Sequence, residues 1–157
     1  MEITVKKVAG DYSSEQDIWN LIHYVITRKR SENRFTYIGG QLIYLGDCDT
    51  IFNQIMFVKH AYVKNRGKQM IHLVVSAPVF NRYADEDVWD MGRQIAGIFK
   101  GHQVLFAVHD DTQYIHLHFA INTVSMFDGS KLQFNPPWLR EKISRIIQGY
   151  WKRKYRR

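Results

Sequence analysis

The expected fold follows from one stretch of the chain, Val104-Leu-Phe-Ala-Val-His-Asp-Asp-Thr-Gln-Tyr-Ile-His-Leu-His-Phe-Ala-Ile-Asn122. From Tyr114 to Asn122 apolar and polar side chains alternate, which is typical of a β-strand because successive strand side chains point to opposite faces. The run 104–108 is a second apolar segment of strand character, and the polar residues 110–113 between the two favour a turn. The stretch therefore predicts a β-hairpin.

The same stretch holds three of the seven histidines, His109, His116 and His118. His116 and His118 project from one face of the second strand, about 6.5–7 Å apart at the backbone, and His109 ends the first strand beside them. Three neutral imidazoles leave coordination positions open, as a catalytic metal site requires, and they suit Zn, Mn, Fe or Ni. The spacing therefore predicts a three-histidine metal site, with a chance cluster of packed or solvated histidines as the alternative.

Two acidic residues, Asp110 and Asp111, directly follow His109. Either carboxylate could accept a hydrogen bond from a ligand imidazole and so orient it. Aspartate is also common in turns for its own local hydrogen bonding. The residues alone leave both interpretations open.

The composition is that of one intracellular domain. A length of 157 residues suits a single domain spanning residues 1–157, with enough chain to bury a core. Cys48 is the single cysteine, so no internal disulfide can form and the reducing cytoplasm is the expected compartment. Because residues 1–8 lack an apolar signal segment and no stretch approaches a membrane span, we expect no membrane partner.

The formal charge is +7, from 22 Lys and Arg against 15 Asp and Glu. Basic clusters interleaved with aromatic residues favour single-stranded nucleic acid, which offers phosphates to neutralise and bases to stack. A solvated basic surface is the alternative. One cluster lies at 64–68, and the candidate DNA-binding residues of the other two are Arg28, Lys29, Arg30, Lys152, Arg153, Lys154, Arg156 and Arg157.

The N-terminal part predicts a short strand over 2–8 and a helix from Ser13 or Ser14 to about Arg28. A serine followed three residues later by Gln16 or Asp17 resembles a capping box. The apolar stripe of this helix is Ile18, Leu21, Ile22 and Val25.

Tyr24 lies about 110° from the centre of that stripe, at its flank. A tyrosine there can direct its hydroxyl into a neighbouring cleft, or it can simply be an amphipathic residue at the edge of the core.

The rest of the chain alternates helices with strands. Residues 28–46 predict a loop or lax hairpin, followed by a helix from Asp49 or Thr50 to about 63. Further predictions are a strand over 70–76, a helix from Asp85 to about 100 closed by Gly101, a short strand over 131–135 after the hairpin, and a basic C-terminal helix and tail over about 137–157 opened by Pro136-Pro137. This order favours an α+β fold with a single antiparallel sheet layered with helices.

The element His116-Leu-His118 is the His-hydrophobic-His pattern after which HUH endonucleases are named. With it the sequence resembles the relaxases, or mobilisation nucleases, of that class. Ile22-His-Tyr-Val-Ile-Thr-Arg28 resembles the family's N-terminal tyrosine motif, and His72-Leu-Val-Val-Ser76 resembles the strand between the two motifs. The third motif continues through 119–131, so the resemblance covers roughly residues 15–135.

The resemblance implies the HUH relaxase fold and metal-dependent nicking of one DNA strand at an origin of transfer. In such enzymes a tyrosine becomes linked to the 5′ phosphate while a 3′ hydroxyl leaves, and the later rejoining needs no ATP. A free tyrosine has a pKa of about 10 and is a weak nucleophile at neutral pH, so a metal that polarises the phosphate assists it. By this resemblance Tyr24 is the nucleophile.

The resemblance also assigns His109, His116 and His118 to a divalent metal ion, with Mn or Mg expected in use and Zn or Ni as alternatives. The implied partners are single-stranded DNA at an origin of transfer and accessory mobilisation proteins.

Further residues take roles from the resemblance alone. Asp111 is favoured over Asp110 as the catalytic acid that orients a ligand, because the family's motif also places an acid there. His72 and Ser76 are expected near the DNA.

Two other functions stay open at this point, because relaxases are usually much longer and this chain ends after one further helix. One is a catalytically silent relaxase remnant that binds single-stranded DNA, and the other is a metal-dependent phosphoesterase that uses a bound water. If the N-terminal helix is placed differently, the alternative nucleophiles are Tyr37, Tyr44 and Tyr62.

Overall fold

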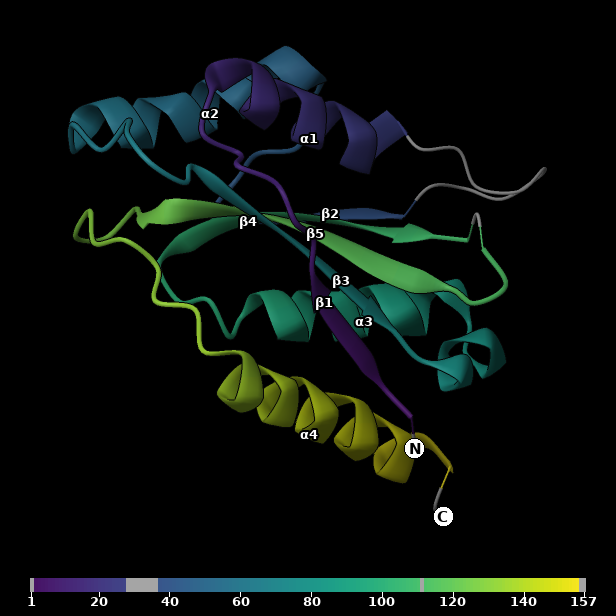
Figure 1. The fold of residues 1–157 in the computed structure, drawn as a ribbon. Coiled ribbons are helices and arrows are strands. Elements are labelled where there is room, and N and C mark those ends of the chain that lie inside the picture. The colour runs from purple at the N-terminus through teal and green to yellow at the C-terminus, as the bar shows by residue number, and fades with distance from the viewer. Residues whose placement is uncertain (1, 28–36, 111, 156–157) are drawn as a thin grey trace.

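The computed structural model describes residues 2–27, 37–110 and 112–155, which form a five-stranded antiparallel sheet with helices on both faces (Figure 1). In spatial order the strands are β1 (Thr4–Lys7), β3 (Met70–Ser76), β5 (His116–Ser125), β4 (His102–His109) and β2 (Ile38–Gln41). The helices are α1 (Glu15–Thr27), α2 (Cys48–Ala61), α3 (Asp85–Ala96) and α4 (Pro136–Tyr155), with a short 3-10 helix, η1 (Pro78–Arg82). The predicted α+β class is confirmed.

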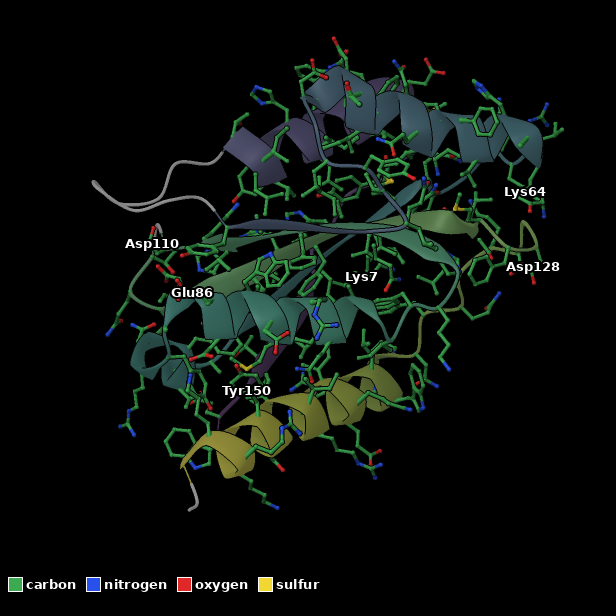
Figure 2. The ribbon with its side chains drawn as sticks, turned by 180° about the vertical axis from the view of Figure 1, so that it is seen from behind. Lys7, Lys64, Glu86, Asp110, Asp128 and Tyr150 are labelled. Carbon is green, nitrogen blue, oxygen red and sulfur yellow. The ribbon has the colours of Figure 1, made fainter. Side chains whose placement is uncertain are left out.

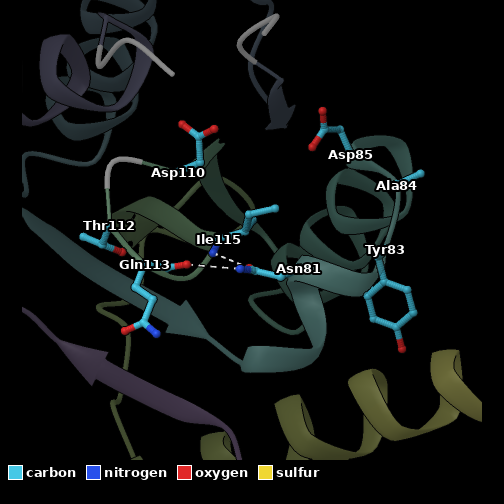
Figure 3. Close-up of a pocket in the computed structure, with 8 residues that line it drawn as sticks. All are labelled: Asn81, Tyr83, Ala84, Asp85, Asp110, Thr112, Gln113 and Ile115. Atoms are coloured by element: carbon cyan, nitrogen blue, oxygen red, sulfur yellow. Dashed lines mark hydrogen bonds between the residues drawn. The ribbon is translucent and has the colours of Figure 1, made fainter. Parts of the chain in front are cut away.

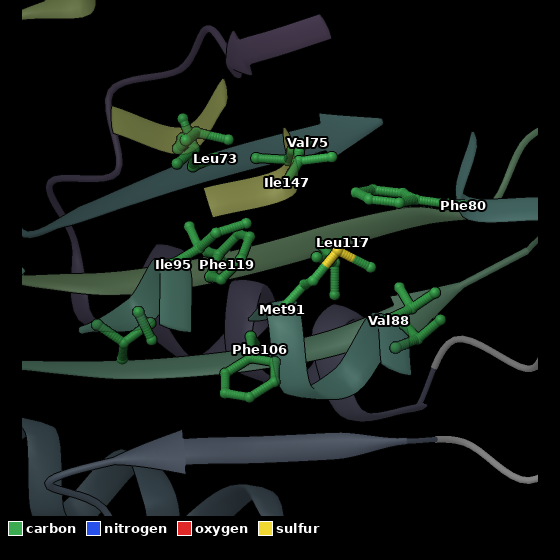
Figure 4. Packing of buried hydrophobic residues seen from close by; sticks show 14 of the residues in the cluster. Leu73, Val75, Phe80, Val88, Met91, Ile95, Phe106, Leu117, Phe119 and Ile147 are labelled. Atoms are coloured by element: carbon green, nitrogen blue, oxygen red, sulfur yellow. The ribbon is translucent and has the colours of Figure 1, made fainter. Parts of the chain in front are cut away.

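The helices divide into two layers. Helices α1 and α2 cover one face of the sheet, and α3 and α4 cover the other (Figure 1). Odd-numbered residues of β5, such as Leu117 and Phe119, pack with Met91 of α3 and Ile147 of α4 (Figure 4). The even-numbered residues, including the histidines, therefore face α1 and α2. None of the described helices is long and apolar enough to cross a membrane.

The predicted hairpin is present as β4 and β5, which pair antiparallel with His109 opposite His116. Its link is held by one side chain from η1, because Asn81 Nδ2 donates to the Gln113 carbonyl (3.1 Å) and Asn81 Oδ1 accepts from the Ile115 backbone N–H (2.7 Å) (Figure 3). The strand that carries the histidines is thus fixed just before its first residue.

The start of α1 matches the predicted capping box. Ser14 Oγ accepts from the Asp17 backbone N–H (3.0 Å), and Asp17 Oδ2 accepts from the backbone N–H groups of Ser13 and Ser14 (3.2 Å each). The predicted apolar stripe, from Ile18 to Val25, is buried.

Two predictions between α1 and α2 were wrong. Part of the expected loop 28–46 forms β2, an edge strand paired with β4, because Gly39 lets the chain pass directly over the ring of Phe106. Helix α2 begins at Cys48 with Asp47 as its cap, since Asp47 Oδ1 accepts from the Thr50 N–H (2.8 Å). The helix therefore starts before the expected Asp49 or Thr50.

Two predictions in the second half were also wrong. Helix α3 ends at Ala96 with Gly97 as its C-cap, whereas Gly101 (φ +79°) lies in the turn that enters β4. Residues 131–135 form no strand beyond one bridge between Lys131 and Val124, because the chain then turns away toward α4.

Candidate active site

The three histidines of the hairpin converge on the sheet face covered by α1. One ring nitrogen from each of His109, His116 and His118 can be chosen so that all three atoms lie within 4.8 Å of one another. All three residues are buried, with at most 7% of their surface exposed. The antiparallel register causes this arrangement, since His109 is the cross-strand partner of His116 and His118 follows on the same face.

Hydrogen bonds define which ring nitrogens can bind a metal. His109 Nε2 lies 3.0 Å from the Val25 carbonyl of α1, and His116 Nδ1 lies 2.9 Å from the Tyr114 carbonyl. A carbonyl only accepts, so in a neutral ring these nitrogens carry the proton, and the opposite nitrogens, Nδ1 of His109 and Nε2 of His116, would be the atoms that face a metal ion. Oriented neutral imidazoles of this kind fit a divalent transition metal ion.

The third imidazole is held by another histidine. His118 Nδ1 lies 2.8 Å from Nε2 of His72, and the Nδ1 of His72 lies 3.2 Å from the hydroxyl of Tyr12. Burial, and to a smaller degree His109, lowers the pKa of His72 to about 4, so the ring is neutral at pH 7.

Of the two β3 residues expected near the substrate, His72 thus lies against the cluster itself. Ser76 is half-buried and is the cross-strand partner of His116, on the same face of the sheet.

Tyr24 lies above the cluster. Its ring centroid is 5.3 Å from that of His118, 5.5 Å from that of His109 and 5.8 Å from that of His72. The flank position on α1 explains this, because the buried stripe of the helix packs on the sheet while Tyr24, half-buried, reaches the histidines beside it. The structure therefore brings the candidate nucleophile and the candidate ligands together.

The alternative tyrosines lie in other surroundings. Tyr37 donates to Glu86 of α3 (2.9 Å), and Tyr62 donates to the Met126 carbonyl (2.9 Å). Tyr44 is 87% exposed in the connection between β2 and α2.

The sequence did not single out Tyr12, which is the described tyrosine that bonds to His72. Tyr12 lies before α1 and has a left-handed backbone conformation (φ 42°), which a non-glycine residue rarely adopts and which no pattern in the sequence predicts.

The carboxylates beside His109 are only partly described. Asp110 lines a cavity of about 460 Å³ at the hairpin link, together with Tyr83 at the end of η1 and Asp85 at the start of α3 (Figure 3). Asp111 lies outside the described residues. Among the described groups, backbone carbonyls serve His109 and His116 as acceptors.

The predicted basic clusters lie away from the histidines as far as they are described. Lys64 and Asp128 lie at the end of the sheet opposite Asp110 (Figure 2). On α4, Lys154 pairs with Asp87 of α3, and Arg153 packs on the Tyr150 ring. These tail residues, with Lys152, thus belong to the helical layer on the other face of the sheet (Figure 1). Outside the described residues lie Arg28, Lys29, Arg30, Arg156 and Arg157.

A comparison with protein families shows which family the chain matches. The model of the MobA/VirD2-like relaxase nuclease domain matches residues 24–153, which include the hairpin and Tyr24. The chain belongs to the relaxase family. The resemblance found in the sequence is thereby confirmed, and the matched region contains the three histidines of this relaxase.

Named relatives agree with the family. The relaxase is 23% identical over 112 residues to Protein TraI of Escherichia coli, and 24% identical over 112 residues to a second Protein TraI of the same organism. Each alignment covers 70% of this chain and 15% of the relative, so the chain spans only a small part of the length of these curated relatives.

A solved structure described as the molecular basis of vancomycin resistance transfer in Staphylococcus aureus shares the fold. Its TM-score is 0.65 at 10% identity, over 99% of this chain and 95% of that chain.

Proposed function

We propose that this relaxase domain nicks single-stranded DNA at an origin of transfer, with Tyr24 as the nucleophile and a divalent ion held by His109, His116 and His118. The observation that carries the proposal is the position of the Tyr24 ring, whose centroid lies 5.3 Å from that of His118 and 5.5 Å from that of His109, two of the three proposed ligands. A nucleophile and a metal centre at this separation can act on the same phosphate group.

The reaction is a transesterification. The Tyr24 oxygen forms a bond to phosphorus and loses its proton, while the bond from phosphorus to the 3′ oxygen breaks and the 3′ hydroxyl leaves with a proton. The product is a 5′-phosphotyrosine ester. A bound divalent ion would polarise the scissile phosphate as a Lewis acid.

The surrounding residues orient these groups. The buried stripe of α1 holds Tyr24 against the sheet, and the Val25 carbonyl fixes the ring of His109. Burial of the histidines excludes bulk water from the metal-binding face. Three imidazoles are compatible with Mn and with Zn or Ni, and Mn or Mg is the ion that we propose in use.

The proposed substrate and partners follow from the family and the charge. A net charge of +7 supports binding to a polyanion. Single-stranded DNA at an origin of transfer is therefore the proposed partner, and accessory mobilisation proteins are the proposed associates.

A denaturing gel with end-labelled single-stranded DNA covering a candidate origin of transfer tests the proposal. Reactions contain Mn or Mg and compare the wild type with Tyr24→Phe, His116→Ala and the matched control Tyr44→Phe. The control changes an 87% exposed tyrosine, so it should behave as the wild type. A covalent protein–DNA adduct is expected in the wild type and control and is expected to be lost in the other two variants.

Other outcomes assign other functions. An adduct that persists in Tyr24→Phe would move the nucleophile to another tyrosine, and cleavage without any adduct would indicate a phosphoesterase that uses water. Binding of DNA and metal without cleavage, across DNA pools of varied sequence, would favour a silent binding module.

A further inference from the structure

Three side chains from three separate segments form a hydrogen-bonded chain that ends at the histidine cluster. Tyr12, which precedes α1, lies 3.2 Å through its hydroxyl from Nδ1 of His72 on β3. His72 Nε2 lies 2.8 Å from Nδ1 of His118 on β5. The nitrogen of His118 that remains for a metal ion is Nε2.

A neutral imidazole carries one proton, so the whole chain can point in one of two directions. If Tyr12 donates to His72, then His72 donates to His118 and the proton of His118 lies on Nε2. If His118 donates to His72 instead, then His72 donates to the Tyr12 oxygen. Only this second direction leaves the Nε2 lone pair of His118 available for coordination.

We propose that Tyr12 and His72 are positioning residues of the metal centre, which fix the ring of His118 and select its metal-binding tautomer. The inference rests on the metal centre of the proposed function and assigns to two further residues the task of preparing it. A histidine thus takes the place that a carboxylate or carbonyl usually has behind a ligand imidazole.

The geometry around Tyr12 holds its hydroxyl in place. The Tyr12 carbonyl accepts from the Gln69 backbone N–H (2.7 Å), and the Lys68 ammonium lies 5.8 Å from the Tyr12 ring centroid. The residue adopts φ 42°, a left-handed conformation that costs a non-glycine residue conformational energy. His72, the middle member of the chain, is itself only 7% exposed, so burial restricts the movement of its ring.

Zn²⁺ affinity without DNA tests the proposal, measured at pH 8 by competition with a chelator. His72→Leu removes the acceptor and should weaken Zn²⁺ binding about 10- to 100-fold. His72→Gln offers an amide oxygen near the position of Nε2 and should restore most of the affinity. Tyr12→Phe should weaken binding in the wild-type background but have no further effect beside His72→Gln, because the amide needs no partner to act as an acceptor.

Tyr62→Phe is the matched control, since it also removes a hydroxyl hydrogen bond but does so at the Met126 carbonyl. Its affinity should equal that of the wild type. Thermal unfolding of each variant establishes that the fold is intact, and Tyr12→Phe keeps the test decisive if His72→Leu does not fold.

Long-range ¹H–¹⁵N NMR of histidine-labelled protein reads the proton positions directly. In the Zn²⁺-loaded wild type, the proton should lie on Nδ1 of both His118 and His72. A proton on Nε2 of His72 in the loaded protein would overturn the proposal, as would wild-type affinity in Tyr12→Phe and His72→Leu.

The two proposals fail in different ways. If the wild type binds no Zn²⁺ at the histidines, both are wrong. If it binds Zn²⁺ and the positioning variants behave as the wild type, only the positioning role is wrong. If affinities and proton positions follow the expectation but DNA is never nicked, only the proposed reaction is wrong.

Discussion

Replacing Gly39 by alanine should destabilise the protein strongly, although alanine is ordinarily tolerated in a strand. Gly39 of β2 is the cross-strand partner of Phe106 on β4. A Cβ at Gly39 would lie 2.1, 2.5 and 2.7 Å from three atoms of the Phe106 ring. The ring is 1% exposed, and on α3 a Cβ at Gly92 would lie 2.8 Å from it, so the ring has no space into which to move.

Overpacking of this kind costs about 1–3 kcal/mol, and the shortness of the contact favours the upper end, about 3 kcal/mol. In a protein of this size that loss lowers the melting temperature by about 6–12 °C. Urea and thermal denaturation of Gly39→Ala measure it.

Gly40→Ala is the matched control, because the nearest atoms to its added Cβ would be Leu45 Cδ2 at 3.1 Å, the Ile43 carbonyl oxygen at 3.2 Å and Ile43 Cβ at 3.6 Å, all farther away than the Phe106 ring is from a Cβ at Gly39. The free energy of unfolding of Gly40→Ala should fall by less than about 1 kcal/mol. In the Gly39→Ala background, Phe106→Leu should cost less than it does alone, with a coupling energy above about 1 kcal/mol. Equal losses in the two glycine variants would refute the reasoning.

Three other predictions address the hairpin link, a buried lysine and the basic tail. Asn81→Ala removes both hydrogen bonds to the hairpin link, so it should lower the free energy of unfolding by about 1–3 kcal/mol and speed hydrogen exchange of the Ile115 amide. An unchanged exchange rate at Ile115 would contradict this prediction. Burial lowers the pKa of Lys59 to about 7, so above pH 7 the folded state binds fewer protons than the unfolded state. The free energy of unfolding of the wild type, relative to that of Lys59→Met, should therefore rise by about 2 kcal/mol from pH 7 to 9. Parallel pH profiles of the two proteins would disprove that assignment. Glutamine replacement of the basic tail should weaken binding to single-stranded DNA and reduce the slope of log K against log salt concentration by about 0.7 per lost phosphate contact. An unchanged affinity and slope would show that the tail does not bind DNA. The replaced residues are Lys152, Arg153, Lys154, Arg156 and Arg157.

The hairpin could be predicted because its information is local. Strict alternation after Tyr114 defined the strand, and the register that pairs His109 with His116 then brought the histidines together. The stripe of α1 likewise fixed which side of the helix packs on the sheet, and hence where Tyr24 could reach.

The missed features depend on contacts between distant residues. Glycine is rare in strands, so Gly39 and Gly40 predicted a loop, whereas in the structure this segment pairs with β4 and the ring of Phe106 occupies the space that a Cβ at Gly39 would need. The bond from Tyr12 to His72 joins segments 60 residues apart and leaves no periodic signal. A net charge does not say on which face of the sheet the basic residues lie, so the sequence could not reveal that the described part of the tail packs on the α3 side of the sheet.

Helix α1 contributes to the site twice within two residues. Tyr24 supplies the hydroxyl, and the adjacent Val25 carbonyl accepts the hydrogen bond of His109. Separation of α1 from the sheet would therefore withdraw the proposed nucleophile and break the hydrogen bond that orients His109 in the same event. The position of Tyr24 and the orientation of His109 are consequently both linked to the docking of one helix on the sheet.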